Sequence, residues 1–552
     1  MASEPRVQRI ESFYAHPSSY KHWKLSVDGA VATLTMDIEE GNGLRSDDYE
    51  LKQNSYDLGV DIELNDAIER LRFEHPEVRT LVFTSAQPKV FCAGANIKML
   101  ATSTHGFKVN FCRYTNETRC ALEDASMNSG LKSIAALNGT AAGGGYELAL
   151  ACDEIYLVDD GSSAVSLPEV PLLGVLPGTG GLTRLVDKRK VRRDIADVFC
   201  TKAEGFRTRE AVRMRLIDGG YPRSKWEAGI AARAAELAAR PSDAPRGFPR
   251  SEVHSTLSED GHTRDYKYVT LALDEGQRVA RLTIRAPSEP APADIDALHE
   301  EGDHAWSVWA FRELEDALLH LRFHHDTVGT ILLHTQGDSA AVIAHDAVVQ
   351  GSDAWLAREI RLLRARILRR VDNTARSVFA IIDEGSCFVG SLFELALAAD
   401  RSYMLEDEDG AVTIQITDAS AGAYPMSTGL TRLQSRFLGE PESVGSTIED
   451  SRPLTAPEAF DGGLVTQAPD DIDWEDELRI AVEERASLSP DALTGMEQNL
   501  RFVGAETCDS KIFGRLSAWQ NWIFQRPNAV GCDGALTLYG HPTRPAFDWR
   551  RT

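Results

Sequence analysis

The chain has 552 residues, and its 59 lysines and arginines stand against 84 aspartates and glutamates, which gives a formal net charge of −25. A chain of this length is expected to form roughly two to four domains, and an acidic surface argues against nucleic acid as the main partner. The first twenty residues lack the apolar core of a signal peptide, and no apolar run reaches the length of a membrane span. We therefore expect a cytoplasmic protein with no membrane partner.

The first half of the chain alternates strand patterns with a helical pattern. Short apolar runs predict strands over 31–36, 80–84, 134–137 and 155–158, and apolar residues at helical spacing predict a helix over 59–72. This alternation is typical of α/β proteins.

A glycine-containing turn follows the strand at 80–84. The residues CAGAN at 92–96 come after a polar turn, and a helix begins behind them. The next helix is expected over 105–124, where Cys112 and Asn116 are four residues apart and so share one face. A cysteine in such a place is more often a small buried apolar residue than a reactive thiol, so Cys112 is a candidate for lining a pocket.

A second strand-turn-helix segment carries a glycine triplet. Residues 133–150 read SIAALNGTAAGGGYELAL, with an apolar strand, Gly143, Gly144 and Gly145, and a helix expected to begin around Glu147. Glycines allow a ligand to approach the backbone closely, and the free N–H groups of a helix's first turn carry partial positive charge. An oxyanion could bind there, although the glycines could also serve only to let strand and helix pack closely.

A third segment places an acid before a turn rich in proline and glycine. Residues 166–185 read SLPEVPLLGVLPGTGGLTRL and contain Glu169. Taken singly, Glu147 and Glu169 would each be assigned to a solvated surface, and only their combination with the glycine turns suggests acid–base chemistry.

Three segments of the first half return in the second half at a nearly constant spacing. The residues LRF occur at 71 and again at 321, an offset of 250. The pattern YELALA, which contains Glu147, returns as FELALA, which contains Glu394, an offset of 247. The residues GLTRL occur at 181 and again at 429, an offset of 248. We therefore predict a duplicated unit. The expected division is a first domain at 1–240, a linker rich in proline and serine at 241–261, a second domain at 262–470 and a helical association region at 471–552.

The second half has lost most of the chemistry-bearing residues. Gly390-Ser391-Leu392 replaces the glycine triplet, the segment 343–347 replaces the CAGAN turn, and Thr417 falls opposite Glu169. Glu394 is retained without these neighbours, and an acid that lacks the other residues of a site is more often structural than catalytic. We predict that the second half is a packing partner.

The C-terminal region shows helical patterns from Glu475 and over 493–524. Trp519, Trp522 and Ile523 suggest burial against another domain or subunit, so we expect a homodimer.

Other site classes find no support in the sequence. The eight cysteines are scattered with no C-x-x-C pair, so neither a metal site nor a disulfide framework is expected, and a reducing compartment fits. The phosphate-binding patterns GxGxxG after a strand and GxxxxGK[ST] are absent, as are the hydrolase patterns built on Ser/His/Asp or HExxH.

The three motifs of the first half, taken in order, resemble the crotonase, or enoyl-CoA hydratase/isomerase, superfamily. The resemblance implies tandem ββα spiral domains with a C-terminal helical region, an acyl-CoA substrate, and no metal or other cofactor. In the matching positions the backbone N–H groups of Ala95 and Gly144 would hold the thioester oxygen, and Glu147 and Glu169 would be the acid–base pair. The resemblance assigns the remaining positions to substrate binding: Lys52, Lys98, Cys112, Asn116 and Gly143.

The layout of the whole chain resembles a ring-cleaving branch of this superfamily. That resemblance implies hydrolytic opening of 2,3-epoxybenzoyl-CoA to 3,4-didehydroadipyl-CoA semialdehyde and formate, in benzoate degradation. Two alternatives stay open: an enoyl-CoA hydratase/isomerase with a non-catalytic second half, and a CoA-binding scaffold without activity. One departure from the superfamily pattern is Asn96 where an aspartate is commoner, which removes a charge beside the donor at Ala95.

Overall fold

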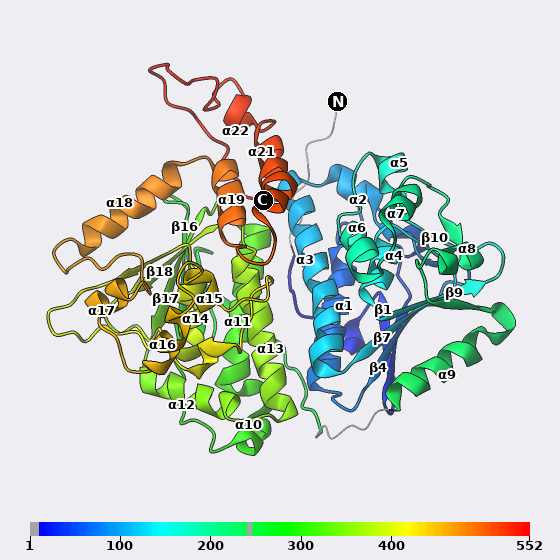
Figure 1. Ribbon diagram of the computed structural model, residues 1–552, viewed down its shortest axis with the longest axis horizontal. Coiled ribbons are helices and arrows are strands. Elements are labelled where there is room, and N and C mark those ends of the chain that lie inside the picture. The colour runs from blue at the N-terminus through cyan, green and yellow to red at the C-terminus, as the bar shows by residue number, and fades with distance from the viewer. Residues whose placement is uncertain (1–9, 240–245) are drawn as a thin grey trace. The chain divides into compact units, whose positions relative to one another are not determined.

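The computed structural model in Figure 1 describes residues 10–239 and 246–552. The chain divides into two compact units, with unit 1 ending at Glu252 and unit 2 beginning at Val253. The α/β class expected from the sequence is confirmed. Within the described residues, no helix is both long enough and apolar enough to cross a membrane.

Unit 1 is built on a six-stranded sheet with the order β1-β2-β4-β7-β9-β12. The first two strands are antiparallel and the others are parallel, so the predicted strands lie side by side in the middle of the sheet. The strands of this sheet are β1 (Trp23–Asp28), β2 (Val31–Met36), β4 (Thr80–Ser85), β7 (Lys132–Leu137), β9 (Glu154–Asp159) and β12 (Gly219–Pro222).

A second, four-stranded sheet in unit 1 has the order β11-β10-β8-β5, and two short strands pair beside it. These strands are β5 (Val90–Cys92), β8 (Thr140–Ala142), β10 (Ala164–Ser166) and β11 (Phe206–Arg207), with β3 (Ser55–Tyr56) paired to β6 (Gly94–Ala95). Because β5 and β8 precede the two glycine turns and β10 precedes Glu169, this sheet aligns all three motifs at one edge.

The helices of unit 1 include the two that the sequence predicts. Asp57 caps α1 by accepting a hydrogen bond from the N–H of Gly59, and Thr104 caps α3 by accepting one from Phe107. The helices are α1 (Leu58–Phe73), α2 (Ile97–Thr102), α3 (His105–Asp124), α4 (Gly144–Ala151), α5 (Glu169–Leu173), α6 (Gly181–Thr183), α7 (Arg193–Cys200), α8 (Thr208–Arg213) and α9 (Trp226–Ala238).

Unit 2 contains a seven-stranded sheet in which β15-β16-β17-β18-β19 reproduces the order β1-β2-β4-β7-β9 of unit 1. In both units the first pair is antiparallel and the following pairs are parallel, as the repeated segments predict. The strands are β13 (Thr256–Leu257), β14 (Thr263–Asp265), β15 (Val269–Asp274), β16 (Val279–Arg285), β17 (Thr330–Gln336), β18 (Ser377–Ile382) and β19 (Arg401–Met404).

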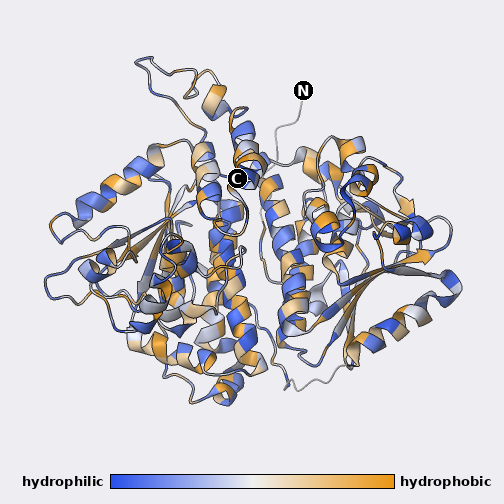
Figure 2. Cartoon of the chain, viewed as in Figure 1, coloured by the Kyte–Doolittle hydropathy of each residue, from blue (hydrophilic) through white to orange (hydrophobic). Residues whose placement is uncertain are grey.

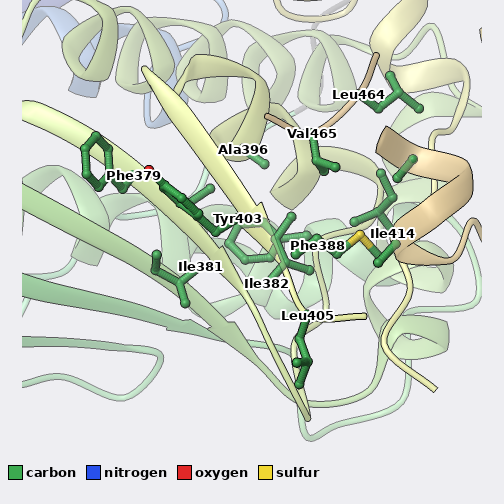
Figure 3. Packing of buried hydrophobic residues seen from close by; sticks show 14 of the residues in the cluster. Phe379, Ile381, Ile382, Phe388, Ala396, Tyr403, Leu405, Ile414, Leu464 and Val465 are labelled. Atoms are coloured by element: carbon green, nitrogen blue, oxygen red, sulfur yellow. The ribbon is translucent and has the colours of Figure 1, made fainter. Parts of the chain in front are cut away.

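The core of unit 2 lies between this sheet and its helices. Every residue of β18 is buried, as expected for a parallel strand covered on both faces, and Figure 3 shows its Phe379, Ile381 and Ile382 beside Tyr403. The helices are α10 (Ile295–Glu301), α11 (Trp306–His324), α12 (Ser339–Gln350), α13 (Trp355–Asp372), α14 (Gly390–Ala398), α15 (Arg432–Arg436), α16 (Ser443–Glu449), α17 (Ala456–Asp461) and α18 (Trp474–Ser487).

The C-terminal helices differ in two respects from the expectation. The pattern over 493–524 is interrupted after Leu500, and it forms α19 (Pro490–Leu500), α20 (Cys508–Lys511) and α21 (Ser517–Ile523), before a last short helix, α22 (Pro527–Val530). Ile523 and Trp519 lie against Gly495, so these side chains pack on α19 of their own unit. Figure 2 shows polar and apolar residues interleaved along outer helices such as α9 and α18, as in helices with one face against a core.

Of the expected linker at 241–261, residues 241–245 lie outside the described residues. The rest is not a free connection. The Phe248 N–H donates to the Phe73 carbonyl at 3.1 Å, and the two rings are 5.9 Å apart, which ties this stretch to unit 1. Thr256–Leu257 already belongs to the sheet of unit 2. Both ends of the described part of this stretch therefore contact folded neighbours, and the division at 241–261 stays a prediction.

Candidate active site

The two glycine turns of unit 1 are in contact. Gly94 has a φ of +92°, and a β-carbon there would lie 2.9 Å from the backbone nitrogen of Gly144. Gly143 has a φ of +52° and precedes the first residue of α4. Only glycine adopts these conformations without strain at so close an approach, so the turns hold Ala95 and Gly144 side by side.

The N–H of Ala95 is directed away from the strand paired beside it, and the N–H of Gly144 belongs to the first turn of a helix. The carbonyl of Tyr56 accepts the N–H of Asn96 at 2.8 Å, and since successive amides of a strand point to opposite edges, the N–H of Ala95 faces away from β3. Gly144 is the first residue of α4, and no side chain caps this helix. The helix begins three residues before the position expected from the sequence, which places the middle glycine at the donor position.

Glu147 is held in place by three donors. Its carboxylate accepts the N–H groups of Thr179 at 2.9 Å and of Gly181 at 2.8 Å, and it also accepts the Thr179 hydroxyl. The side chain is buried. Three donors fix the orientation of the carboxylate, so this group can orient a water molecule or stabilise positive charge.

Glu169 is the opposite case, because one of its oxygens has no partner. The residue begins α5 and is 8% exposed, and its Oε2 atom is buried without a hydrogen-bond partner in the described part of the chain. A β-carbon on Gly143 would lie 2.7 Å from Oε1, so the carboxyl sits directly against that turn. Burial, and then the charge of Glu147, raise the pKa of Glu169 to about 7. Such a carboxyl can take and return a proton near neutral pH.

Tyr56 is a site residue that the sequence analysis missed. A β-carbon at position 144 would collide with its hydroxyl, and this hydroxyl is buried with no hydrogen-bond partner among the described residues. The ring lies 6.0 Å from Phe111, with the Arg119 guanidinium 5.5 Å from its centre. Burial raises the pKa of Tyr56 well above its usual value, so the hydroxyl keeps its proton. No local pattern marks this residue, since its contact with Gly144 is made only in the fold.

Thr179 was also missed, although it lies within the PGTGG segment. Its neighbours belong to the predicted pocket: Asn116 donates to the carbonyl of Gly178 at 3.0 Å, and a β-carbon on Gly178 would be 3.5 Å from the Cys112 sulfur. Burial raises the pKa of Cys112 to about 11, with the charge of Glu147 adding to the effect. The thiol is therefore neutral at physiological pH, which agrees with a lining role.

The two predicted lysines lie on the surface around Glu50. The ammonium of Lys52 is 2.6 Å from the Glu50 carboxylate, and Lys98 donates to the carbonyl of Asp48. Their side chains are 67% and 64% exposed, respectively, so neither is held in a pocket. Lys52, and to a lesser extent Lys98, lower the pKa of Glu50, so both lysines lie near this carboxylate.

Asn96 has a structural role that an aspartate could not fill. Its Oδ1 caps α2 by accepting the N–H of Met99 at 2.9 Å, and its amide nitrogen donates to the Glu50 carbonyl at 2.8 Å. A carboxylate could make the first bond but has no proton for the second, so the substitution holds the segment carrying Glu50 against the turn.

In unit 2 the corresponding helix start is filled by a side chain of the protein. Gly390 keeps a φ of +51°, but the N–H of Ser391 donates to the Asp346 carboxylate at 2.7 Å, and Arg364 binds the same carboxylate at 2.6 Å. Residues 343–347, expected in place of the turn, belong to the helix α12. Glu394 is not alone, since it accepts a hydrogen bond from the Ser420 hydroxyl at 2.7 Å and pairs with a buried arginine.

Comparison with known proteins gives a consistent picture. Residues 50–268 match the enoyl-CoA hydratase/isomerase family. The chain is 51% identical over 556 residues to the benzoyl-CoA-dihydrodiol lyase of Aromatoleum evansii, and the alignment covers 100% of this chain and 99% of that protein. Among solved structures, a protein described as "Enoyl-CoA hydrates" from Geobacillus kaustophilus is 31% identical, over 40% of this chain and 75% of that chain, with a TM-score of 0.35. An enoyl-CoA hydratase from Bacillus anthracis is 25% identical over 40% of this chain and 77% of that chain, with a TM-score of 0.34.

Proposed function

The chain belongs to the benzoyl-CoA-dihydrodiol lyase family and carries an enoyl-CoA hydratase/isomerase segment, and on this basis we propose that it is a ring-cleaving lyase of an aromatic acyl-CoA thioester. The substrate is 2,3-epoxybenzoyl-CoA, which with two molecules of water yields 3,4-didehydroadipyl-CoA semialdehyde and formate. The observation that carries the assignment to unit 1 is Oε2 of Glu169, which is buried with no partner among the described residues, in a carboxyl that lies against Gly143 at the uncapped start of α4.

The first stage consumes one water molecule. Glu169 takes a proton from this water as it adds to the epoxide, while the fixed carboxylate of Glu147 orients it. The bond between the two oxygenated ring carbons breaks, and its electrons remain in the carbon chain, where two former ring carbons each gain a hydrogen. One of these hydrogens is the proton returned by Glu169, and the other comes from the new hydroxyl group, so Glu169 is ionised again before the second stage. The product of this stage is a dialdehyde, so the step needs no oxidant.

The second stage releases formate. Another water molecule adds to the aldehyde next to the carbon that bears the thioester, and Glu169 takes a proton from the resulting hydrate. Formate leaves, and its bonding electron pair moves onto the thioester as an enolate, whose oxygen accepts the N–H groups of Ala95 and Gly144. Glu169 then returns its proton to carbon. Losing one such donor typically costs roughly 100- to 1,000-fold in rate.

Tyr56 acts in this scheme as a positioning residue. Its backbone pairs with the strand that carries Ala95, and its hydroxyl abuts Gly144, so one residue spaces the two donors. The turn after Glu169 adds an apolar surface suited to a ring, since Leu172 and Leu176 are each 66% exposed.

The remaining predicted site residues are assigned to parts of the substrate that suit their chemistry. The exposed Lys52 and Lys98 would meet the phosphates of CoA, and Cys112, Asn116 and Gly143 would line the acyl site. Because both stages balance with water alone, the proposal includes no metal, flavin or oxygen.

The proposal extends to location and assembly. Eight free thiols fit a reducing cytoplasm. In the C-terminal helices Phe513 is 75% exposed and Phe524 is 55% exposed, which favours self-association as a homodimer. The non-catalytic role of unit 2 is supported by Asp346, which occupies the place of a ligand oxygen.

The decisive experiment measures formate released from 2,3-epoxybenzoyl-CoA without oxygen, with crotonyl-CoA hydration assayed in parallel. We expect formate at catalytic rates and little crotonyl-CoA turnover. Rapid crotonyl-CoA hydration without formate would instead identify an enoyl-CoA hydratase with a non-catalytic second unit, and no turnover of either thioester would indicate a binding scaffold.

A further inference from the structure

Unit 2 contains a cavity of about 460 Å³ that is unusually rich in arginine for so acidic a protein. It lies where the end of α14 and the start of β19 meet α15, α18 and α19. Three carboxylates also line it. The arginines are Arg401, Arg432, Arg436, Arg485 and Arg501.

All three carboxylates of the cavity are already paired. Each forms an ion pair with one of the lining arginines, and the nitrogen–oxygen distances are between 2.6 and 3.1 Å. The pairs are Asp372 with Arg432, Asp400 with Arg501, and Glu497 with Arg485. The acids therefore neutralise three of the five arginines and leave a surplus of positive charge.

The surplus resides on Arg401 and Arg436, neither of which makes an ion pair with a carboxylate of the described residues. Arg401 donates to the hydroxyl of Tyr403 at 3.3 Å, and Arg436 donates to the carbonyl of Gly463. A guanidinium has five N–H donors, so most of those on these two side chains remain available.

Two further observations show that buried arginine groups of the cavity could take up an additional anion. The Nε atom of Arg432 is buried and has no hydrogen-bond partner within the described ranges. Burial lowers the pKa of Arg436, and burial followed by the charge of Arg401 lowers the pKa of Arg485. A cation held away from water is stabilised by an anion placed beside it.

Part of the cavity lining is apolar. It is formed by Leu397, Ala398, Met426, Met496 and Leu500. A ligand that satisfies both the charged and the apolar parts of the lining has an anionic head and an apolar body. A bare inorganic ion would leave the apolar part in contact with water, and a long acyl-CoA is much larger than about 460 Å³.

We propose that this cavity binds a small organic carboxylate, with its carboxylate group between Arg401 and Arg436 and its apolar body against α19. The site is separate from the one in unit 1, and the proposal does not depend on the reaction assigned there. A paired guanidinium and carboxylate also explains why arginine, rather than lysine, lines the cavity, since two planar groups can form parallel hydrogen bonds.

The test is isothermal titration of the full-length protein with hexanoate, in the presence of saturating CoA so that the site in unit 1 is occupied. We expect one hexanoate site per chain, and at least about tenfold weaker binding in the R401Q/R436Q variant, because two charge-assisted contacts are lost. R544Q, which removes an exposed arginine of the same unit, is the matched control and should bind as the parent does.

Two ligand controls make the result decisive. Hexanamide has the same body without the charge and should not bind, and inorganic phosphate should bind much more weakly than hexanoate. Equal binding to the parent and R401Q/R436Q, equal binding of hexanamide, or binding of phosphate alone would overturn the proposal. Thermal unfolding of each variant checks the fold, and the single variant R401Q, at a partly exposed position, serves if the double variant unfolds.

Discussion

Replacing Glu169 with glutamine should raise the stability of unit 1 at high pH while strongly reducing turnover. The carboxyl has a pKa of about 7 in the folded protein, against an ordinary value of 4.5. Below pH 4.5 it is neutral in both states. As the pH rises, the unfolded chain ionises first and the folded protein holds the extra proton until about pH 7. The free energy of unfolding therefore falls over this interval.

The size of the effect follows from the difference in pKa. The difference between the folded pKa of about 7 and the ordinary value of 4.5 corresponds to about 3 kcal/mol in total, of which about 2 kcal/mol falls between about pH 5.5 and about pH 8. Glutamine has no charge to desolvate, so the advantage of E169Q over the parent should grow by that amount across the interval. Urea unfolding read by pulse proteolysis, with fragments of unit 1 quantified by mass spectrometry, measures it separately from unit 2.

Kinetics supply the second readout. Because Glu169 must be ionised to take the first proton, kcat/KM of the parent should rise with pH through about 7, and E169Q should lose roughly 100- to 10,000-fold in kcat. Glu63 is the matched control, since burial also raises its pKa to about 7 but it binds only backbone N–H groups of residues 21–23. E63Q should keep the kinetic pKa. Near-parental turnover by E169Q, or loss of the kinetic pKa in E63Q, would refute the assignment.

Three further substitutions test the supporting contacts. Thr179→Val removes one donor from Glu147 and should lower kcat about ten- to a hundredfold in steady-state assays, with little change in KM. Gly144→Ala should destabilise unit 1 in thermal unfolding, and adding Tyr56→Phe should recover part of the loss, because the hydroxyl is the nearest atom. Asp346→Ala leaves a buried arginine unpaired and should cost unit 2 about 3–5 kcal/mol, and added formate or acetate should restore part of its melting temperature.

The parts of the site that could be predicted are those encoded locally. A strand, a glycine turn and a helix start are neighbours in sequence, so the motifs around Ala95 and Gly144 could be read without a structure. The helix α3 has the expected bounds, because apolar spacing and an N-cap threonine are local signals. The start of α4 could not be placed, since glycines have low helix propensity and only contacts in the fold hold them there.

What could not be predicted depends on partners distant in the chain. Glu147 and Glu169 are the same residue type in similar apolar surroundings, and nothing in the sequence distinguishes their roles. The PGTGG loop gives three donors to the first and none to Oε2 of the second, and this difference separates a fixed carboxylate from one that exchanges protons. Tyr56 escaped notice for the same reason, because its hydroxyl meets Gly144 only after folding.

The two units show how one backbone can support either catalysis or stability. Each has a glycine with positive φ at the start of a helix, Gly143 in unit 1 and Gly390 in unit 2, and in unit 2 the next N–H, of Ser391, donates to a carboxylate. This carboxylate belongs to Asp346, paired with Arg364, so the donor is satisfied by the protein itself. In unit 1 the N–H of Gly144 has no side-chain cap, and Oε2 of Glu169 is buried with no partner among the described residues, an arrangement that costs folding energy. Under the proposed mechanism this cost keeps the N–H free to bind a transient oxyanion, which a site already occupied by a carboxylate could not do.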